Sequence, residues 1–188
     1  LRLYTGPCHA PLNAALRERQ TSEWATTIAC CFSAILKLSF SSDGAAANGA
    51  RRVYRGVRES EISLPDAFWR PEEASVQNGK FAGGVERSFT STTTNPAVAL
   101  DYAGSGPGSI FVIDFEFTSR AASVGWLSQY PHEEELLWPP CLGLSVIGAH
   151  ESPQWQKKLL IVSAQVSTAK PDTNELLGPR YVPGTAAA

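Results

Sequence analysis

The hydrophobic pattern of the chain changes once, near residue 50, and this change limits the folds that are open to it. Over 24–38 the apolar side chains recur at the spacing of a helix that buries one face. Over 109–117 apolar and acidic side chains alternate, as in an antiparallel strand with one buried face. Because helical patterns precede strand patterns along the chain, the sequence predicts an α+β fold.

Shorter patterns define the expected elements on both sides of this change. We expect helices over 12–19 and 22–38, a loop over 41–49, and strands over 52–57, 89–93, 109–117, 134–138 and 158–166. A third helix is expected over 95–103, because Asn95 is a good cap and Pro96 at the first helical position loses no hydrogen bond. The glycine-rich segment 104–108 lacks the lysine of a phosphate-binding loop and is interpreted as a turn, and His150 as part of a loop.

Composition favours one globular domain. The chain has 188 residues, of which 43% are hydrophobic and 18% charged, and this balance is ordinary for a folded protein with a core. We expect a single domain over 1–170 and a partly disordered tail over 171–188, where Pro, Gly, Thr and Ala are frequent. Because the chain contains no methionine, we expect a mature fragment or a domain of a longer protein, and we expect it to be monomeric.

Charge and cysteine content argue against several classes of partner. A net charge of −2 lacks the basic excess that is typical of nucleic-acid binding. No stretch approaches the roughly 20 apolar residues that a membrane helix needs. The four cysteines and three histidines show no zinc-site spacing, so we expect no metal. Free, buried thiols are the favoured interpretation of the cysteines, and they favour an intracellular location.

An acidic segment that runs straight into an apolar strand is the first candidate for chemistry. Glu133, Glu134 and Glu135 precede the apolar residues of 136–138. In a strand, Glu133 and Glu135 share one face and lie about 7 Å apart, where their charges repel. A site that stabilises a developing positive charge gains from this arrangement. The alternative interpretation is a solvated edge without chemistry.

Two more segments carry residues suited to binding an anionic ligand. Arg55 near the end of a strand is a bidentate phosphate binder, and Gly56 after it has no side chain, so that the backbone can approach a ligand. The strand 89–93 is rich in hydroxyl groups, which can orient neighbouring carboxylates. Taken singly, each segment is better explained without a ligand, Arg55 by an ordinary ion pair and 89–93 by an edge strand.

The order of these segments resembles the arginine-specific mono-ADP-ribosyltransferases of the Arg–Ser–Glu class, which vertebrate enzymes share with actin-modifying bacterial toxins. The resemblance covers about residues 3–168 and rests on motifs in family order: Tyr4-Thr5-Gly6, Tyr54-Arg55-Gly56-Val57, Phe89-Thr90-Ser91-Thr92 and Glu133-x-Glu135 before Pro139-Pro140. Thr93 stands where the family usually has serine. Trp138 replaces an aliphatic residue or Phe, and we expect it in the core.

The resemblance implies the ADP-ribosyltransferase fold, in which N-terminal helices pack on a split sandwich of two mainly antiparallel sheets with NAD⁺ between them. It also implies roles for four residues in cleavage of NAD⁺. Arg55 would hold the phosphates, Gly56 would offer backbone hydrogen bonds to the nicotinamide amide, and Ser91 would position Glu135. Glu135 would bind the nicotinamide ribose and stabilise the oxocarbenium-like transition state.

The acceptor is implied by the first acidic position. Glu133 would engage and deprotonate an arginine guanidinium of a protein substrate, whereas members directed at other residues often have glutamine there. Tyr130 would stack on the guanidinium, unless it is a loop tyrosine that packs on the sheet. Two alternatives remain open: an NAD⁺ glycohydrolase with water as acceptor, and a catalytically silent binding module.

Overall fold

The computed structural model of the protein describes residues 1–40, 52–60, 83–115 and 121–165. The loop predicted over 41–49, the last residues of the strands predicted over 109–117 and 158–166, and the tail predicted over 171–188 lie outside these residues. Within the described ranges, none of the helices is long and apolar enough to cross a membrane.

The N-terminal part is helical, as predicted, with shifted boundaries. A short helical turn over Tyr4–Cys8 leads into α1 (His9–Glu18), and a turn over Ser22–Trp24 leads into α2 (Ala25–Ser39). Helix α1 begins before the predicted start because Pro11 lies in its first turn, where a missing N–H costs no hydrogen bond. It ends at Arg19, whose left-handed backbone lets its N–H bond the carbonyls of Ala15 and Leu16.

Strands make up most of the remainder, and the α+β class is confirmed. The described strands form one hydrogen-bonded order, β2-β7-β8-β4-β1-β3-β6-β5, in which β4 and β8 are parallel and the other neighbours antiparallel. Their bounds are β1 Arg52–Arg58, β2 Gly83–Glu86, β3 Thr90–Thr93, β4 Gly108–Asp114, β5 Ala122–Ser123, β6 Glu135–Trp138, β7 Leu142–Ser152 and β8 Lys157–Gln165.

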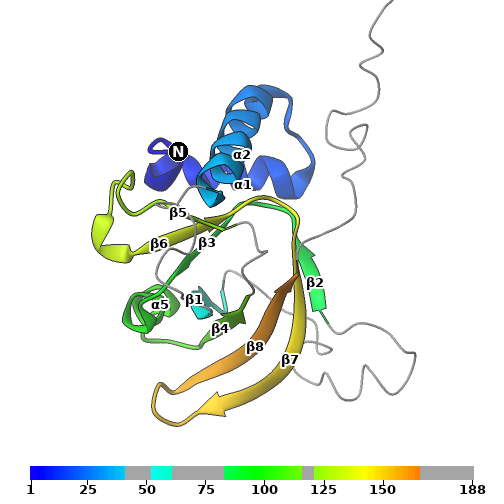
Figure 1. Ribbon diagram of the computed structural model, residues 1–188. Helices are drawn as coiled ribbons and strands as arrows, with labels where there is room; N and C mark the ends of the chain where they lie inside the picture. The colour runs from blue at the N-terminus through cyan, green and yellow to red at the C-terminus, as the bar shows by residue number, and fades with distance from the viewer. Residues whose placement is uncertain (41–51, 61–82, 116–120, 166–188) are drawn as a thin grey trace, which may run out of the picture.

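The sheet consists of two blocks that meet at one point. Strands β1 and β4 pair along their whole length, from Arg52 opposite Asp114 to Arg58 opposite Gly108. Strands β1 and β3, in contrast, pair only at Tyr54 opposite Thr93. The block β2-β7-β8-β4-β1 and the block β3-β6-β5 therefore correspond to the two predicted sheets, joined by a minimal bridge (Figure 1).

Three predictions about strands were wrong in detail. Strand β4 was expected to bury one face, but both faces are buried: Ile110 and Val112 belong to one core cluster, and Phe111 and Ile113 belong to another. His150 lies in β7, opposite Leu159 of β8, and not in a loop. Strand β7 escaped the pattern analysis because its register shifts between Val146 and Gly148, which interrupts the alternation of apolar and polar residues. The strand predicted over 134–138 begins one residue later, at Glu135, because Glu134 has a left-handed backbone with a φ of 48°.

Helices cover the two blocks at different places. Figure 1 shows α1 and α2 together beside β5 and β6, and α5 (Pro96–Ala103) beside β1 and β4. Leu12 and Ile35 from the N-terminal helices pack with Phe89 and Leu137 in one core cluster. The predicted cap of α5 is confirmed, since Asn95 accepts a hydrogen bond of 3.0 Å from the N–H of Ala97. Trp138 is buried in a second cluster between the strands, as predicted.

Candidate functional site

Glu135 is a buried carboxylate at the first position of β6. It lies opposite Thr93, while Ser91 lies opposite Leu137, so Ser91 and Glu135 are diagonal neighbours on one face of the β3–β6 pair. The Ser91 side chain forms a hydrogen bond with Glu135. The structure thus brings the predicted serine and glutamate into direct contact.

The surroundings of Glu135 act on its charge in both directions. Burial raises the pKa of the carboxyl group above its ordinary value, and the negative charge of Glu133 adds to this increase. The hydrogen bond from Ser91 and the positive charges of His9 and Arg55 oppose it. With only 5% of the residue exposed, water screens the Glu135 charge little, so an adjacent cation would be strongly stabilised.

Arg55 connects the two strand blocks at this site. It lies on β1, and its Nη1 donates a hydrogen bond of 2.9 Å to the backbone carbonyl of Ser91 on β3. Its positive charge also lowers the pKa of Glu135. Arg55 and Glu135 are 80 residues apart in the sequence, and Ser91 lies between them. The junction of the two blocks brings the three residues together.

Gly56 lies where helix α5 packs too closely against β1 to leave room for a side chain. A Cβ atom at this position would lie 1.8 Å from the carbonyl oxygen of Ala99, in the middle of α5. Gly56 was predicted to allow close approach of a ligand, whereas in the structure it allows close approach of α5. A backbone contact of Gly56 with nicotinamide remains a prediction.

The acidic segment before β6 is a turn and not a strand, so the prediction that Glu133 and Glu135 share a strand face was wrong. Residues Pro131–Glu133 form a single helical turn, and Glu134 follows in the left-handed region. That conformation costs a residue other than glycine about 1 kcal/mol. Thr94 Oγ1 offsets this cost by donating a hydrogen bond of 2.5 Å to the Glu134 carboxylate.

Thr93 fastens the same turn to β3. Its Oγ1 donates a hydrogen bond of 2.6 Å to the carbonyl of Glu133 and accepts one of 3.0 Å from the N–H of Asn95. Thr93 is the position at which the chain departs from the family serine, and the hydroxyl group that both residues share is the group that makes these bonds. The acidic turn is therefore held against the start of α5.

Glu133 is half-buried, and its side chain contacts Tyr102, a residue that was not predicted to belong to the site. Tyr102 on α5 donates a hydrogen bond of 2.7 Å from its hydroxyl group to Glu133 Oε1. Burial raises the pKa of Tyr102, and the hydrogen bond and charge of Glu133 raise it further. The one available indication in the sequence was an aromatic residue in a helix of otherwise small and aliphatic side chains, beside Asp101.

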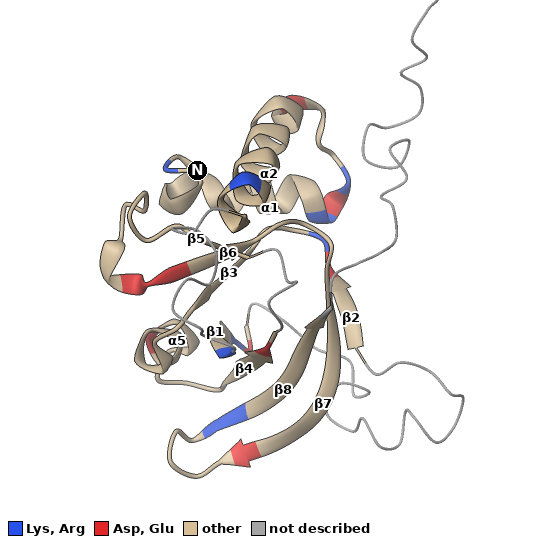
Figure 2. Ribbon diagram, in the orientation of Figure 1, with Lys and Arg blue, Asp and Glu red and all other residues tan. Residues whose placement is uncertain are grey.

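Tyr130 lies in the loop before the acidic turn, with 46% of its surface exposed. Its ring meets the ring of His132 edge-on, at 6.3 Å between centroids. The N-terminal segment holds this loop, since Thr5 Oγ1 accepts a hydrogen bond of 3.0 Å from the N–H of Gln129. Tyr130 is thus presented at the surface near Glu133, and not packed on the sheet (Figure 2 marks the acidic start of β6 in red).

Tyr4 and Asn13 support the site from the helical part. The Tyr4 hydroxyl accepts a hydrogen bond of 3.0 Å from Asn13 Nδ2 and donates one of 3.5 Å to the carbonyl of Phe89, directly before β3. Burial is the main reason that the pKa of Tyr4 is raised to about 12, and the charges of Arg55 and Glu135 also act on it. Tyr4 was part of the family motif, but its contact with the β3 segment was not predicted.

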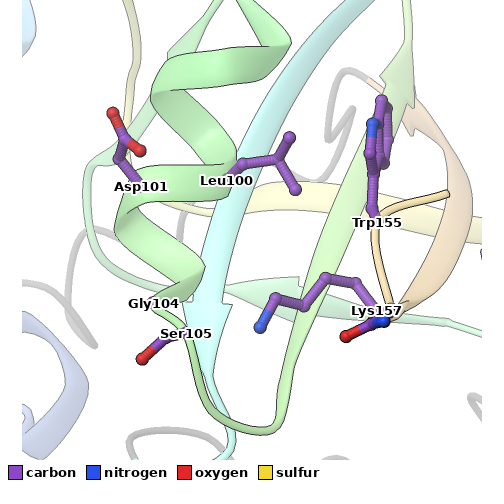
Figure 3. A pocket seen from close by; sticks show the side chains of 7 residues that line it. Leu100, Asp101, Gly104, Ser105, Trp155 and Lys157 are labelled. Carbon is purple, nitrogen blue, oxygen red and sulfur yellow. The ribbon is translucent and has the colours of Figure 1, made fainter.

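A cavity of about 400 Å³ lies elsewhere, between the end of α5 and the turn that joins β7 to β8 (Figure 3). Trp155 and Leu100 line it, and the Lys157 side chain points toward the turn after α5, where it bonds the carbonyl of Gly106. None of the predicted site residues lines this cavity. Among the described residues, no group of three or more His, Cys, Asp or Glu side chains is arranged to hold a metal ion.

The four cysteines differ in exposure. All four are free thiols in the structure; Cys31 is buried, Cys8 and Cys141 are partly buried, and Cys30 is exposed. The prediction that they are buried is therefore wrong for Cys30, which lies on the outer face of α2.

Comparison with solved structures shows the fold. C3stau2 of S. aureus, solved with NAD, is 21% identical over 87% of this chain and 83% of its own, with a TM-score of 0.64. Exoenzyme S of Pseudomonas aeruginosa, solved with human 14-3-3 protein beta and carba-NAD, is 22% identical over 93% of this chain and 78% of its own, with a TM-score of 0.59. Vis of Vibrio splendidus, solved with agmatine, is 18% identical over 89% of this chain and 73% of its own, with a TM-score of 0.54.

Sequence comparison shows the family. No curated protein matches the chain significantly by sequence alone. The family model described as ADP-ribosyltransferase exoenzyme matches residues 1–169, which is nearly the whole chain and includes all the residues of the site above. The predicted ADP-ribosyltransferase fold is confirmed, and the chain belongs to the ADP-ribosyltransferase exoenzyme family.

Proposed function

We propose that the protein transfers a single ADP-ribose unit from NAD⁺ to an arginine of a protein substrate. The observation that carries the proposal is the pairing of two carboxylates with different surroundings. Glu135 is buried and bonded by Ser91, whereas Glu133 lies two residues earlier in a half-exposed turn. One carboxylate is suited to the cation that forms inside the site, and the other to an acceptor that arrives from outside.

Cleavage of NAD⁺ is assigned to the buried group. The bond between the nicotinamide nitrogen and the ribose anomeric carbon breaks, and its electron pair leaves with neutral nicotinamide. Glu135 stabilises the positive charge that develops on the ribose, and Ser91 holds Glu135 in place. Arg55 binds the phosphates, and the backbone of Gly56 binds the nicotinamide amide.

Transfer to arginine is assigned to Glu133 and Tyr130. A guanidino nitrogen forms the new bond to the anomeric carbon, and the guanidinium gives one proton to the Glu133 carboxylate, which passes it to water. The ring of Tyr130 offers an exposed face on which a planar guanidinium can stack. The agmatine in the Vis structure is itself a guanidine, which supports an acceptor of this kind.

Two substitutions separate the roles of the carboxylates. Glu135→Gln removes charge where the cation develops, so we expect NAD⁺ hydrolysis and transfer to fall together, by about 100-fold or more. Glu133→Gln removes the acceptor base and leaves the cleavage site, so transfer should fall at least about tenfold more than hydrolysis. Labelled NAD⁺ with and without agmatine reports both activities in one assay.

The same assay tests the alternatives. Free ADP-ribose without an agmatine conjugate would identify an NAD⁺ glycohydrolase, in which water is the acceptor. Absence of nicotinamide release at any NAD⁺ concentration would identify a catalytically silent binding module. A Glu133→Gln variant with full transfer to agmatine would contradict the role assigned to Glu133. Mass spectrometry of a lysate treated with the protein and NAD⁺ would then report the modified residue type and the protein substrate.

A further inference from the structure

Tyr102 brings a hydroxyl group to the acidic turn from a separate element, α5. It is the aromatic residue of that helix, and its hydroxyl lies 2.7 Å from Glu133 Oε1, across 31 residues of sequence. More than half of the residue, 53%, remains exposed. The contact therefore lies at the surface of the protein.

The backbone of Glu133 is held independently of its side chain. Its carbonyl accepts the hydrogen bond from Thr93, and its N–H donates one of 3.1 Å to the carbonyl of Tyr130. The glutamate side chain still has three rotatable bonds beyond this fixed backbone. Among the hydrogen bonds of the described residues, the one from Tyr102 is the bond that restrains the Glu133 carboxylate.

A carboxylate held at one oxygen still has acceptor positions on the other. Each oxygen of an ionised glutamate can accept more than one hydrogen bond, and a guanidinium presents several N–H groups in one plane. A bond from Tyr102 to Oε1 leaves Oε2 to meet an N–H group of the acceptor. It also removes the entropy that the acceptor would otherwise lose by ordering a mobile glutamate.

From this geometry we infer that Tyr102 is a positioning residue for the acceptor step, which orients Glu133 toward the incoming guanidinium without taking part in NAD⁺ cleavage. The inference rests on the proposed arginine acceptor. The hydroxyl of Tyr102 donates its hydrogen bond to Glu133, while Glu135 is hydrogen-bonded by Ser91. Tyr102 therefore acts on the choice between transfer and hydrolysis.

Two further observations agree with this role. Because the pKa of Tyr102 is raised, its hydroxyl stays protonated and remains a hydrogen-bond donor at neutral pH. Tyr130 lies close enough to contribute to the electrostatic surroundings of Tyr102. Two half-exposed tyrosines thus flank one carboxylate, an arrangement that suits a planar cation better than a neutral acceptor.

Tyr102→Phe tests the inference, because it removes the hydroxyl group and keeps the ring. We expect kcat/KM for agmatine to fall about three- to tenfold, the range for loss of one typical hydrogen bond. Hydrolysis of NAD⁺ without agmatine should stay within about twofold of the starting protein. In a Glu133→Ala background, Tyr102→Phe should cause no further loss of transfer.

Tyr54→Phe is the matched control, since Tyr54 lies on the face of β1 opposite to Arg55 and packs beside α5. It should leave both activities unchanged, and thermal unfolding should show that both variants fold. Full transfer by Tyr102→Phe, or an equal fall of transfer and hydrolysis, would overturn the role of Tyr102 alone. Absence of any agmatine conjugate from the unsubstituted protein would overturn the arginine acceptor, and with it this inference.

Discussion

Burial of the Glu135 side chain disfavours its ionised form. Because its pKa is raised above the value in the unfolded chain, the ionised side chain lowers the free energy of unfolding at neutral pH. Stability contributed at this position rises as the pH falls through the raised pKa. Three neighbours reduce this cost, because each favours the ionised form of Glu135: Ser91, His9 and Arg55.

Substitution of Ser91 should therefore shift the pH dependence of NAD⁺ cleavage. In Ser91→Ala the hydrogen bond that lowers the pKa of Glu135 is lost, so ionisation requires a higher pH. We expect the acidic limb of kcat/KM for NAD⁺ hydrolysis to move to higher pH, and the plateau to fall about 10- to 100-fold from poorer orientation. An acidic limb that stays in place would show that Ser91 does not tune Glu135.

At the scale of elements, α5 links the two halves of the site. It packs against β1 so closely that Gly56 cannot carry a side chain, and its Tyr102 reaches the acidic turn before β6. Thr93 at the end of β3 and Thr94 in the link to α5 bind the backbone and the side chain of the same turn, respectively. The position of the helix thus sets the position of Glu133.

Gly56→Ala should disturb both stability and acceptor use. The new Cβ would overlap the carbonyl of Ala99 and push α5 away from β1, which should lower the free energy of unfolding by about 1–3 kcal/mol. Transfer to agmatine should fall more than NAD⁺ hydrolysis, because Tyr102 moves with the helix. Gly106→Ala is the control, since a Cβ there meets nothing within 4 Å. Equal urea midpoints for the two variants would contradict this account of Gly56.

At the scale of the molecule, the helical N-terminal part supports the block β3-β6-β5 from one side. Tyr4 bonds the segment before β3, and Thr5 bonds the loop that carries Tyr130. Tyr4 is only 2% exposed, and its Asn13 partner is also buried. The N-terminal turn thus hydrogen-bonds both the loop that precedes the two carboxylates and the residue that precedes their partner strand, β3.

The buried Tyr4 should make the whole fold sensitive to alkaline pH. Its pKa is raised from 10.0 to about 12, so the native state holds a proton that the unfolded chain releases. Its contribution to stability is complete below about pH 10 and is lost as the pH rises to about 12, by roughly 2–3 kcal/mol. Tyr4→Phe should lower stability at neutral pH, since Asn13 loses a partner, and should reduce the alkaline decrease seen in urea unfolding. Part of the decrease should persist because the pKa of Tyr102 is also raised.

Local patterns in the sequence predicted the helices and strands of this fold better than they predicted how these elements pack against one another. The helical stripe in α2 and the Asn95 cap of α5 depend on neighbours a few residues away, and both are present. The alternation over 109–117 predicted a strand correctly but not its burial or its partners, since β4 is covered on both faces and pairs parallel with β8. Strand β7 was missed because a register shift and two glycines weaken its alternation. Cys30 was placed in the interior by its residue type, although the orientation of α2 exposes it.

For the site, the sequence by itself determined which side chains are available. These are Arg55, Ser91, Glu133 and Glu135, whose order along the chain is that of a known family and does not depend on packing. Only the tertiary structure decided how they meet. The left-handed Glu134 turns Glu133 out of the strand, and Tyr102 arrives from a helix 31 residues away to hold it. The physical reason is that spacing along a chain reports local conformation, whereas contacts between distant residues depend on how helices and strands pack.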